Sequence, residues 1–397
     1  MFISRRFLQL GAYVACSPLL LHGCAAPAQT PRAAAPAAAL ASADSTPQRL
    51  RIGPAGPAAA AGSASTQPGE PYAARGPDGG LRPQVLAYAR DLARERGLQE
   101  STVTAMLADA RYSETVARLI APAPGKTVSR SWITYRNRVV EPKRINWGAT
   151  FWNENAAQLE RAAQRFGVPA SIIVAIIGVE TLYGRDMGTF RVVDALTTLA
   201  FDYPDPSRPE RAAMFLGQLG DFLTLSARGA LDPQTRGSFA GAIGMPQFMP
   251  GSIARYAVDG DGDGVIDLTR STADAIMSVG NFLVEHGWQR GLPVFAPVGL
   301  PADAAALVDG GLTPRQTWPH LRAAGARALD GGGAPWQSAP LGVIDLPESS
   351  AGTAQYRTAT PNFFALTQYN RSYFYATAVA DLAEALAARR NAVARRP

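Results

Sequence analysis

Glu180 combines the residue type and the setting best suited to chemistry in this sequence. It lies in the apolar run 172–184, and isoleucines stand seven, four and three residues before it. On a helix this spacing places the carboxyl on an apolar face. Burying an unpaired carboxylate is costly, so we expect a raised pKa and a proton retained near neutral pH. Such a group can protonate a leaving oxygen. A structural ion pair with Arg185 or Arg191 is the equally open alternative.

Two further segments offer groups that bind neutral polar ligands. The segment 237–252 is dense in glycine, which lets the backbone approach a ligand closely. Within it, Ser238 and Gln247 offer neutral hydrogen bonds and Phe248 a flat face. The segment 361–376 adds aromatic rings and side-chain amides. A structural loop with packing glycines and an aromatic stripe in the core are the respective alternatives.

An acidic loop has the spacing of a calcium site. Asp259, Asp261, Asp263 and Asp267 occupy its positions 1, 3, 5 and 9, with glycine at position 6. Position 12 is Arg270, so the bidentate glutamate of a full EF-hand is missing. Carboxylates this close repel one another without a cation, and the sequence therefore predicts a structural Ca²⁺. A solvated acidic turn is the alternative.

The N-terminal residues predict export and a lipid anchor. A basic start with the pair Arg5-Arg6 precedes an apolar stretch that ends in Leu21-His22-Gly23-Cys24. This pattern is that of a lipoprotein-type signal peptide, residues 1–24, with Cys24 acylated. Residues 25–80 are rich in Ala, Pro, Gly and Ser, which is typical of a disordered tether. We expect a periplasmic protein held at the outer membrane by lipid alone, or a soluble periplasmic one if Cys24 is not acylated.

Cysteine, histidine and charge exclude several classes of function. The only cysteines, Cys16 and Cys24, lie in the signal region, so the mature chain has no disulfide, thiol nucleophile or cysteine metal site. His286 and His320 are the only histidines outside that region, too few for a histidine-rich zinc site or a Ser-His-Asp triad. The net charge of +6 favours acidic partners. An export signal argues against nucleic acid as that partner.

The elements that position these residues are mostly helices. Apolar residues recur at helical spacing from about residue 81, whereas short apolar pieces separated by Gly and Pro fill the region 292–357. We therefore predict a mainly α protein with an N-terminal helical subdomain and a small α+β subdomain. The expected divisions are 81–165 for the N-terminal helices, 166–291 for the catalytic core with its calcium-type loop, 292–357 for the partly β subdomain and 358–397 for a C-terminal helix that completes the core.

Taken together, these segments resemble one family, the membrane-bound lytic murein transglycosylase B family, which is glycoside hydrolase family 103. The matching segments occur in the family's order over roughly 81–388. They are Gly178-Val179-Glu180-Thr181 with Tyr183-Gly184, the run 194–201, the segment 237–250, the acidic loop, Asn281-Phe282-Leu283 with His286-Gly287-Trp288, and Tyr369-Asn370-Arg371-Ser372. The set is specific, although each segment alone is not.

The resemblance implies a goose-lysozyme-like helical core. It implies that Glu180 is the catalytic acid/base and that Ser238, Gln247, Tyr369 and Asn370 contact the substrate, the glycan strands of peptidoglycan. The implied reaction cleaves the β-1,4 bond between N-acetylmuramic acid and N-acetylglucosamine and leaves a 1,6-anhydromuramoyl end. The 2-acetamido group can stabilise the cation, so a second carboxylate is not required. The sequence departs from the family at Gly251, where serine is usual, and at Arg270.

Two alternatives remain at this stage. A hydrolytic muramidase would use Glu180 as acid and a second carboxylate, Asp194 or Asp202, to direct water, and its product would have a reducing end. A non-catalytic peptidoglycan-binding scaffold would retain the fold without turnover. The intact surroundings of Glu180 argue against the scaffold.

Overall fold

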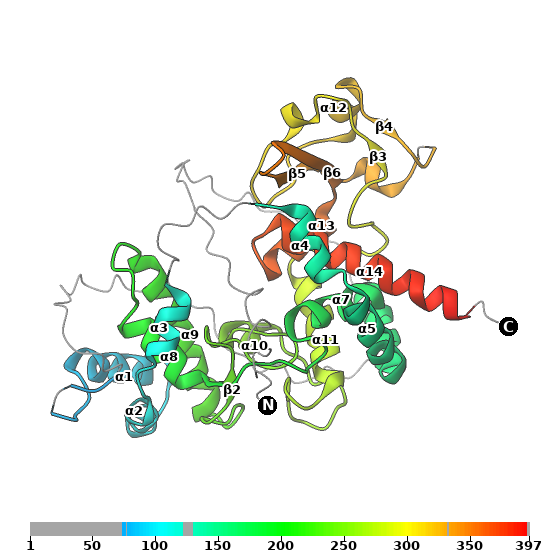
Figure 1. Cartoon of the computed structure of the whole chain (residues 1–397). Coiled ribbons are helices and arrows are strands. Elements are labelled where there is room, and N and C mark those ends of the chain that lie inside the picture. Colours follow the sequence, from blue (N-terminus) through cyan, green and yellow to red (C-terminus); the bar gives the residue numbers. More distant parts are fainter. Residues whose placement is uncertain (1–73, 77, 122–129, 332, 395–397) are drawn as a thin grey trace, which may run out of the picture.

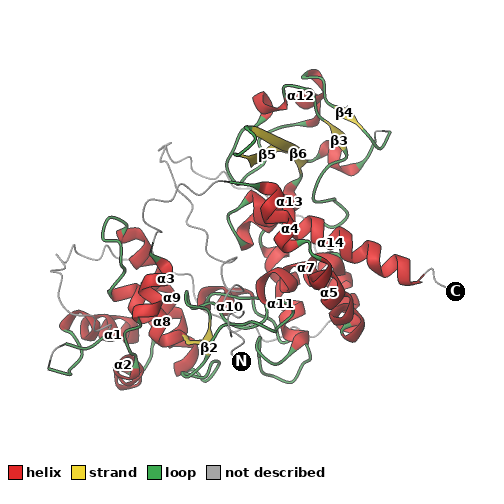
Figure 2. Cartoon of the chain, in the orientation of Figure 1, coloured by secondary structure: helices red, strands yellow, loops and turns green. Residues whose placement is uncertain are grey.

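The structure of the 397-residue chain is a computed structural model that describes residues 74–76, 78–121, 130–331 and 333–394. Helices dominate this part of the chain, and the strands are short (Figure 2). The expected signal peptide, its Cys24 and nearly all of the expected tether lie outside the described residues.

One group of helices forms the end of the molecule drawn at the left of Figure 1. Its first three helices follow one another in the sequence, and α2 and α3 pack against two helices from the middle of the chain. The members are α1 (Pro83–Arg96), α2 (Glu100–Asp109), α3 (Glu114–Ile120), α8 (Val192–Phe201) and α9 (Pro209–Ala227). Local signals set their ends: α1 begins at a proline and stops at Gly97 in the left-handed conformation, and Ser113 caps α3.

A second group surrounds the long C-terminal helix. Its members are α4 (Trp132–Val139), α5 (Pro142–Glu154), α6 (Ala156–Phe166), α7 (Ala170–Thr181), α11 (Thr272–Glu285), α13 (Pro361–Tyr369) and α14 (Tyr373–Ala394). Helix α7 lies at the centre, in contact with α5, α6, α11 and α14. The short helix α10 (Pro250–Tyr256) contacts both α9 and α11 and so joins this group to the first. One hydrophobic core runs through both groups.

The third part is a small α+β unit, drawn at the top of Figure 1. It contains β3 (Val298–Gly299), β4 (Arg327–Ala328), β5 (Gly342–Glu348), β6 (Thr353–Ala359), α12 (Trp318–Ala323) and the 3-10 helices η1 (Ala304–Leu307) and η2 (Pro335–Ser338). Antiparallel pairs join β3 to β4 and β5 to β6. The unit has its own buried cluster, in which Trp318 packs edge-on against Trp336. The predicted partly β region is therefore observed.

Packing between the parts differs in one respect from the division expected from the sequence. The helices of 81–165 do not stay together: α1–α3 belong to the first group, whereas α4–α6 pack around α7, α11 and α14. The apolar pattern inside each helix is local and does not say which partner it will meet. Helices α5 and α6 are separated at Asn155, whose side chain donates to the carbonyl of Phe151.

A buried ion cluster fixes the α+β unit and α4 to the last helix. Asp381 of α14 is almost fully buried and accepts hydrogen bonds from Arg136 of α4 at 2.5 Å and from Arg357 of β6 at 2.6 Å. Burial of a carboxylate is tolerated here because two guanidinium groups pair with it. Within the described residues, no single helix is long and apolar enough to cross a membrane, although α6 and α7, bent by 115° at their junction, satisfy that test as a pair.

Candidate active site

Glu180 lies at the end of a helix that is buried on every side. In α7, each residue from Ile172 to Val179 is buried, so the helix has no polar face, contrary to the amphipathic pattern expected. Glu180 is partly exposed, in the last turn where the helix leaves the core. The core thus holds the backbone rigidly and lets one carboxyl reach the protein surface.

One tyrosine hydroxyl contacts this carboxyl. Tyr375, in the first turn of α14, donates a hydrogen bond of 2.5 Å to Oε1 of Glu180. Desolvation by the surrounding protein raises the pKa of Glu180 from 4.5 to about 7, and the Tyr375 bond opposes that rise. The carboxyl therefore keeps its proton to a much higher pH than an ordinary glutamate does. This degree of protonation is what a general acid requires.

The expected alternative, an ion pair with arginine, does not occur. Arg185 donates to the carbonyl of Leu182, and Arg191 pairs with Asp109 and Asp194. Instead, tyrosines surround the carboxyl: the charge of Glu180 adds to the burial that raises the pKa of Tyr135, Tyr369 and Tyr375. These phenols therefore stay protonated and remain hydrogen-bond donors over the pH range in which Glu180 titrates.

Backbone strain concentrates immediately around Glu180. The non-glycine residues with positive φ in the described chain are Leu182 at 52°, Tyr183 at 64° and Gln247 at 50°. The left-handed region costs about 1 kcal/mol or more for such residues and persists where packing enforces it. The Tyr183 ring provides that packing, because a Cβ placed on Gly178 or Gly148 would approach its hydroxyl to 2.5 Å or 2.3 Å. The hydroxyl donates to the carbonyl of Arg144.

The glycine-rich segment 237–250 is attached to this helix end at several points. Thr181 donates to the carbonyl of Met245 at 2.9 Å, and the Gln247 amide donates to the carbonyls of Met187 at 3.2 Å and Gly244 at 3.0 Å. Tyr369 closes the arrangement: its hydroxyl donates to the carbonyl of Pro246 at 2.6 Å. Its ring stacks on Tyr375, with centroids 6.3 Å apart and planes 14° from parallel. Glu180, Gln247 and Tyr369 are thus brought together.

The sequence profile described as a Transglycosylase SLT domain matches residues 81–384, most of the chain. The chain belongs to this transglycosylase family. It is 37% identical over 333 residues to the membrane-bound lytic murein transglycosylase B of Escherichia coli, an alignment that covers 79% of this chain and 85% of the relative. The family resemblance expected from the sequence is confirmed.

Solved structures agree with the sequence comparison. The soluble lytic transglycosylase SltB1 from Pseudomonas aeruginosa is 38% identical and superposes with a TM-score of 0.69 over 78% of this chain and 100% of that chain. The Escherichia coli lytic transglycosylase Slt35, solved in complex with calcium, is 36% identical with a TM-score of 0.66 over 78% and 94% of the two chains. The lysozyme-like helical fold is confirmed, and the protein is a peptidoglycan lytic transglycosylase.

The remaining expected site residues of the transglycosylase have different surroundings. The hydroxyl oxygen of Ser238 accepts from the backbone of Ala240 and Ala242, at 3.3 Å and 3.0 Å, which leaves its proton free to donate elsewhere. The Asn370 side chain is partly exposed and has no hydrogen-bond partner among the described residues.

The expectation that Phe248 offers its ring to a ligand is not met. Phe248 is only 2% exposed and packs against Phe282 and Tyr369, with ring centroids 5.4 Å and 5.9 Å away. An aromatic residue inside a glycine-rich loop can point outward or into the core, and the Phe248 ring points into the core. Phe248 therefore supports Tyr369 from behind instead of facing the substrate.

Two tyrosines of the transglycosylase site were not among the expected site residues. Tyr375 lies inside an aromatic run that leads into a helix, a pattern more typical of core packing, and Tyr135 follows the start of α4. The hydrogen bond between Glu180 and Tyr375 joins residues 195 positions apart. Periodicity within each helix carries no information about a contact of that range, although a polar hydroxyl in the first turn of α14 was a signal.

Neither candidate for a second catalytic carboxylate lies beside Glu180. Asp194 accepts from Arg191 at 3.1 Å and from the backbone of Arg111 at 2.9 Å, and Asp202 pairs with Arg82 at 2.9 Å. Both carboxylates are on or next to α8, in the first helical group (Figure 1). No carboxylate in the described part of the chain contributes to the pKa of Glu180.

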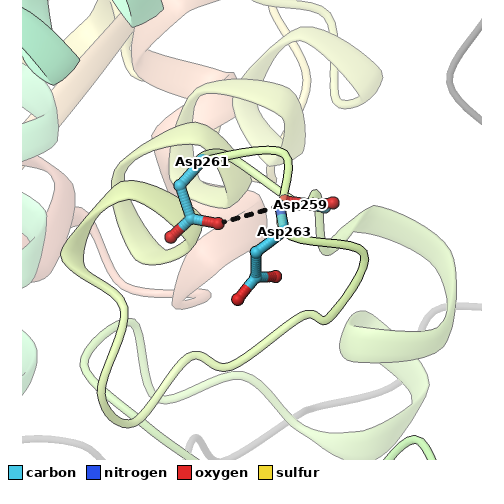
Figure 3. Close-up of side chains that lie close together, drawn as sticks. All are labelled: Asp259, Asp261 and Asp263. Atoms are coloured by element: carbon cyan, nitrogen blue, oxygen red, sulfur yellow. Dashed lines mark hydrogen bonds between the residues drawn. The ribbon is translucent and has the colours of Figure 1, made fainter.

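The acidic loop between α10 and α11 brings three carboxylates together. Oxygens of Asp259, Asp261 and Asp263 lie within 4.8 Å of one another, and Figure 3 shows the three side chains on the curved loop. Backbone amides orient them, for example Gly264 donating to Asp259 at 2.9 Å. Asp267 is not part of this group, because Arg270 donates to it at 2.6 Å. The buried Asp274 closes the loop by accepting from Gly260 at 2.7 Å.

Proposed function

We propose that Glu180 is the sole acid/base of this lytic transglycosylase. The observation that carries the proposal is its carboxyl: it is held at the end of a buried helix, its pKa is about 7, and tyrosines surround it instead of cations. A carboxyl in this state is able both to give and to take a proton near neutral pH. The absence of a neighbouring carboxylate in the described chain favours a mechanism with one acid/base group.

In the proposed reaction the same oxygen pair acts twice. Protonated Glu180 gives its proton to the glycosidic oxygen as the bond from that oxygen to the muramoyl C1 breaks. The C6 hydroxyl oxygen of the same muramoyl residue then bonds to C1, and its proton passes to the Glu180 carboxylate. The 2-acetamido group stabilises the positive charge between these steps. The products are a free 4-hydroxyl and a 1,6-anhydro end, and Glu180 regains the proton that it lost.

We assign the glycan contacts to polar groups that are free or adjacent to the carboxyl. Ser238 and Asn370 have hydrogen-bonding capacity left over, and Gln247 and Tyr369 lie on the segments that are tied to the end of α7. The tyrosine rings supply flat apolar surface for a sugar. These contacts would hold the muramoyl residue against Glu180 and limit the entry of water.

Product analysis tests the proposal directly. Wild-type digestion of sacculi in ¹⁸O-labelled water should give anhydro ends without label, because the attacking oxygen comes from the sugar. Glu180→Gln preserves shape but has no proton to give, so cleavage should fall by at least about 10⁴-fold while glycan binding persists. Asp194→Asn and Asp202→Asn serve as matched controls and should retain most activity. Incorporated label, or near-normal turnover of Glu180→Gln, contradicts the assignment.

We further propose that Asp259, Asp261 and Asp263 hold a structural Ca²⁺. Three carboxylates whose oxygens converge within 4.8 Å are a suitable oxygen donor set for this ion, and the related Slt35 was solved with calcium. Asp267 would join them by releasing Arg270. Calcium should raise the melting temperature, and Asp261→Asn combined with Asp263→Asn should abolish that rise. No shift up to millimolar calcium would refute the proposal.

We also propose that acylated Cys24 anchors the enzyme at the outer membrane, facing the periplasm. The lipobox-like sequence before Cys24 supports this location, and the Escherichia coli relative is described as membrane-bound. Cys24→Ala should move the protein from the membrane fraction to the soluble one. Unchanged partition, together with no incorporated lipid label in the wild type, would contradict it.

A further inference from the structure

Two cations stack on one partly buried tryptophan beside the turn that follows Glu180. The ammonium of Lys143 lies 4.5 Å, and the guanidinium carbon of Arg185 4.6 Å, from the ring of Trp147. Trp147 precedes Gly148 on α5, the glycine under the Tyr183 ring, and Arg185 is two residues beyond Tyr183. The same turn therefore positions both this cationic site and the acid/base group.

The charge of this site is not neutralised within the described chain. Neither Lys143 nor Arg185 forms an ion pair there, and both side chains are exposed. The nearby Glu141 is instead 3.8 Å from Arg144. Lys143 occupies the first turn of α5, where a cation opposes the helix dipole. Stacking contributes about 0.5–1 kcal/mol for each exposed cation, so the two positive groups are held close together without a counter-charge.

We propose that Lys143, Trp147 and Arg185 bind the carboxylates of the stem peptide on the muramoyl residue that is cleaved. This inference rests on the proposed function, because it requires the glycan to pass Glu180. The N-acetylated sugars are neutral there, and the peptides supply the negative charge. The muramoyl residue next to Glu180 bears such a peptide, and Arg185 lies five residues along the chain from Glu180. A guanidinium and an ammonium in contact with one ring offer a carboxylate charge-assisted hydrogen bonds.

The site acts on binding and not on the proton transfer. The pKa of Glu180 is set by burial and by Tyr375, with no contribution from these cations. Replacing the cations should therefore weaken the capture of peptide-bearing strands and leave the chemical step on peptide-free strands intact.

Steady-state kinetics on two substrates test this inference. The double variant Lys143→Gln, Arg185→Gln is compared with wild type on glycan strands that carry stem peptides and on the same strands stripped by an amidase. The lactyl carboxylates that the amidase exposes on the stripped strands are first converted to methylamides, so that these strands carry no anion at the muramoyl residue. We expect KM on the peptide-bearing strands to rise by about 3-fold to 10-fold, since each exposed charge pair contributes modestly. The KM of the wild type, but not of the variant, should rise with salt on these strands. Both constants on stripped strands should be unchanged.

Arg165→Gln is the matched control. Arg165 is also exposed and stacks on a ring, Phe166, at 5.2 Å, but it lies on α6. The kcat and KM of this variant should equal those of the wild type on both substrates. Equal changes of the double variant on both substrates, or no change on peptide-bearing strands, would overturn the inference. So would weaker binding of the variant to vesicles containing phosphatidylglycerol with unchanged glycan kinetics. Failure of the proposed function is recognised separately, because the wild type would then release no anhydro ends from either substrate.

Discussion

The raised pKa of Glu180 makes the stability of this enzyme depend on pH in a way that one substitution removes. Between pH 4.5 and about 7 the folded protein keeps the Glu180 proton while the unfolded chain has lost it. Folding is therefore penalised progressively as pH rises through that window, and the penalty is constant above it. Glutamine cannot ionise, so Glu180→Gln is free of this penalty. The variant should gain stability over wild type only as pH rises.

The size of the gain follows from the same pKa. The interval from 4.5 to about 7 corresponds to roughly 3 kcal/mol at 1.36 kcal/mol for each pH unit. Above pH 7 this penalty acts in full on the wild type and is absent from the variant, so we expect a difference of about 3 kcal/mol at pH 8. At pH 4.5 the two proteins should differ by less than about 0.5 kcal/mol, the size of a neutral substitution.

Urea unfolding of both proteins at a series of pH values measures this difference. Glu160→Gln, a substitution of an exposed glutamate on α6, is the control and should give an offset that does not vary with pH. If the offset between Glu180→Gln and wild type is flat from pH 4.5 to 8, the carboxyl is ordinary in the folded state. Glu180 would then be ionised at neutral pH and could not serve as the general acid in the way proposed, whatever the activity data show.

Three other substitutions probe the surroundings of the acid. Tyr375→Phe removes the hydrogen bond that lowers the pKa of Glu180, so the basic limb of the kcat/KM profile should move up by about one pH unit; an unmoved limb contradicts the geometry. Gly148→Ala places a Cβ 2.3 Å from the Tyr183 hydroxyl. It should lower the free energy of unfolding in urea by about 1–3 kcal/mol and should also lower kcat. Unchanged stability would show that Tyr183 can move away without cost and that packing does not fix the turn. Asp381→Asn leaves two partly exposed arginines without their anion and should cost about 1–2 kcal/mol, and a Tm within 1 °C of wild type would refute that role.

The catalytic acid could be predicted from the sequence, because the apolar residues that mark it lie in the same helical segment. The isoleucines before Glu180 predict burial, and burial predicts the raised pKa, both of which the structure contains. The structure went beyond this prediction in one respect, since α7 is apolar on all sides. Periodicity cannot separate a helix with one buried face from a helix enclosed by others, because the second case depends on neighbours from distant parts of the chain.

The features that could not be predicted from the sequence depend on contacts between residues that are far apart in the chain or on the direction in which a side chain packs. Tyr375 reaches Glu180 across a separation that no helical spacing encodes. Phe248 was expected to face a ligand, because nothing in a run of glycines and aromatics says on which side of the loop the core lies. Asp267 fits a calcium pattern by spacing, yet Arg270, three residues later, takes its carboxylate. In each case the residue type was informative, and its orientation was decided by packing.

The hydrogen bond from α14 to α7 makes the catalytic acid depend on the docking of a distant part of the chain. Glu180 and Tyr375 are 195 residues apart, and the helix that covers α7 is the last one in the described chain. A nascent chain, or a fragment clipped before Tyr373, lacks that cover. In such a fragment we expect water to reach Glu180 and lower its pKa, and the face of α7 that α14 covers would be exposed. The acid/base group is therefore complete only after α14 has docked on α7, and the docking of one distant helix controls both the packing and the protonation of the site.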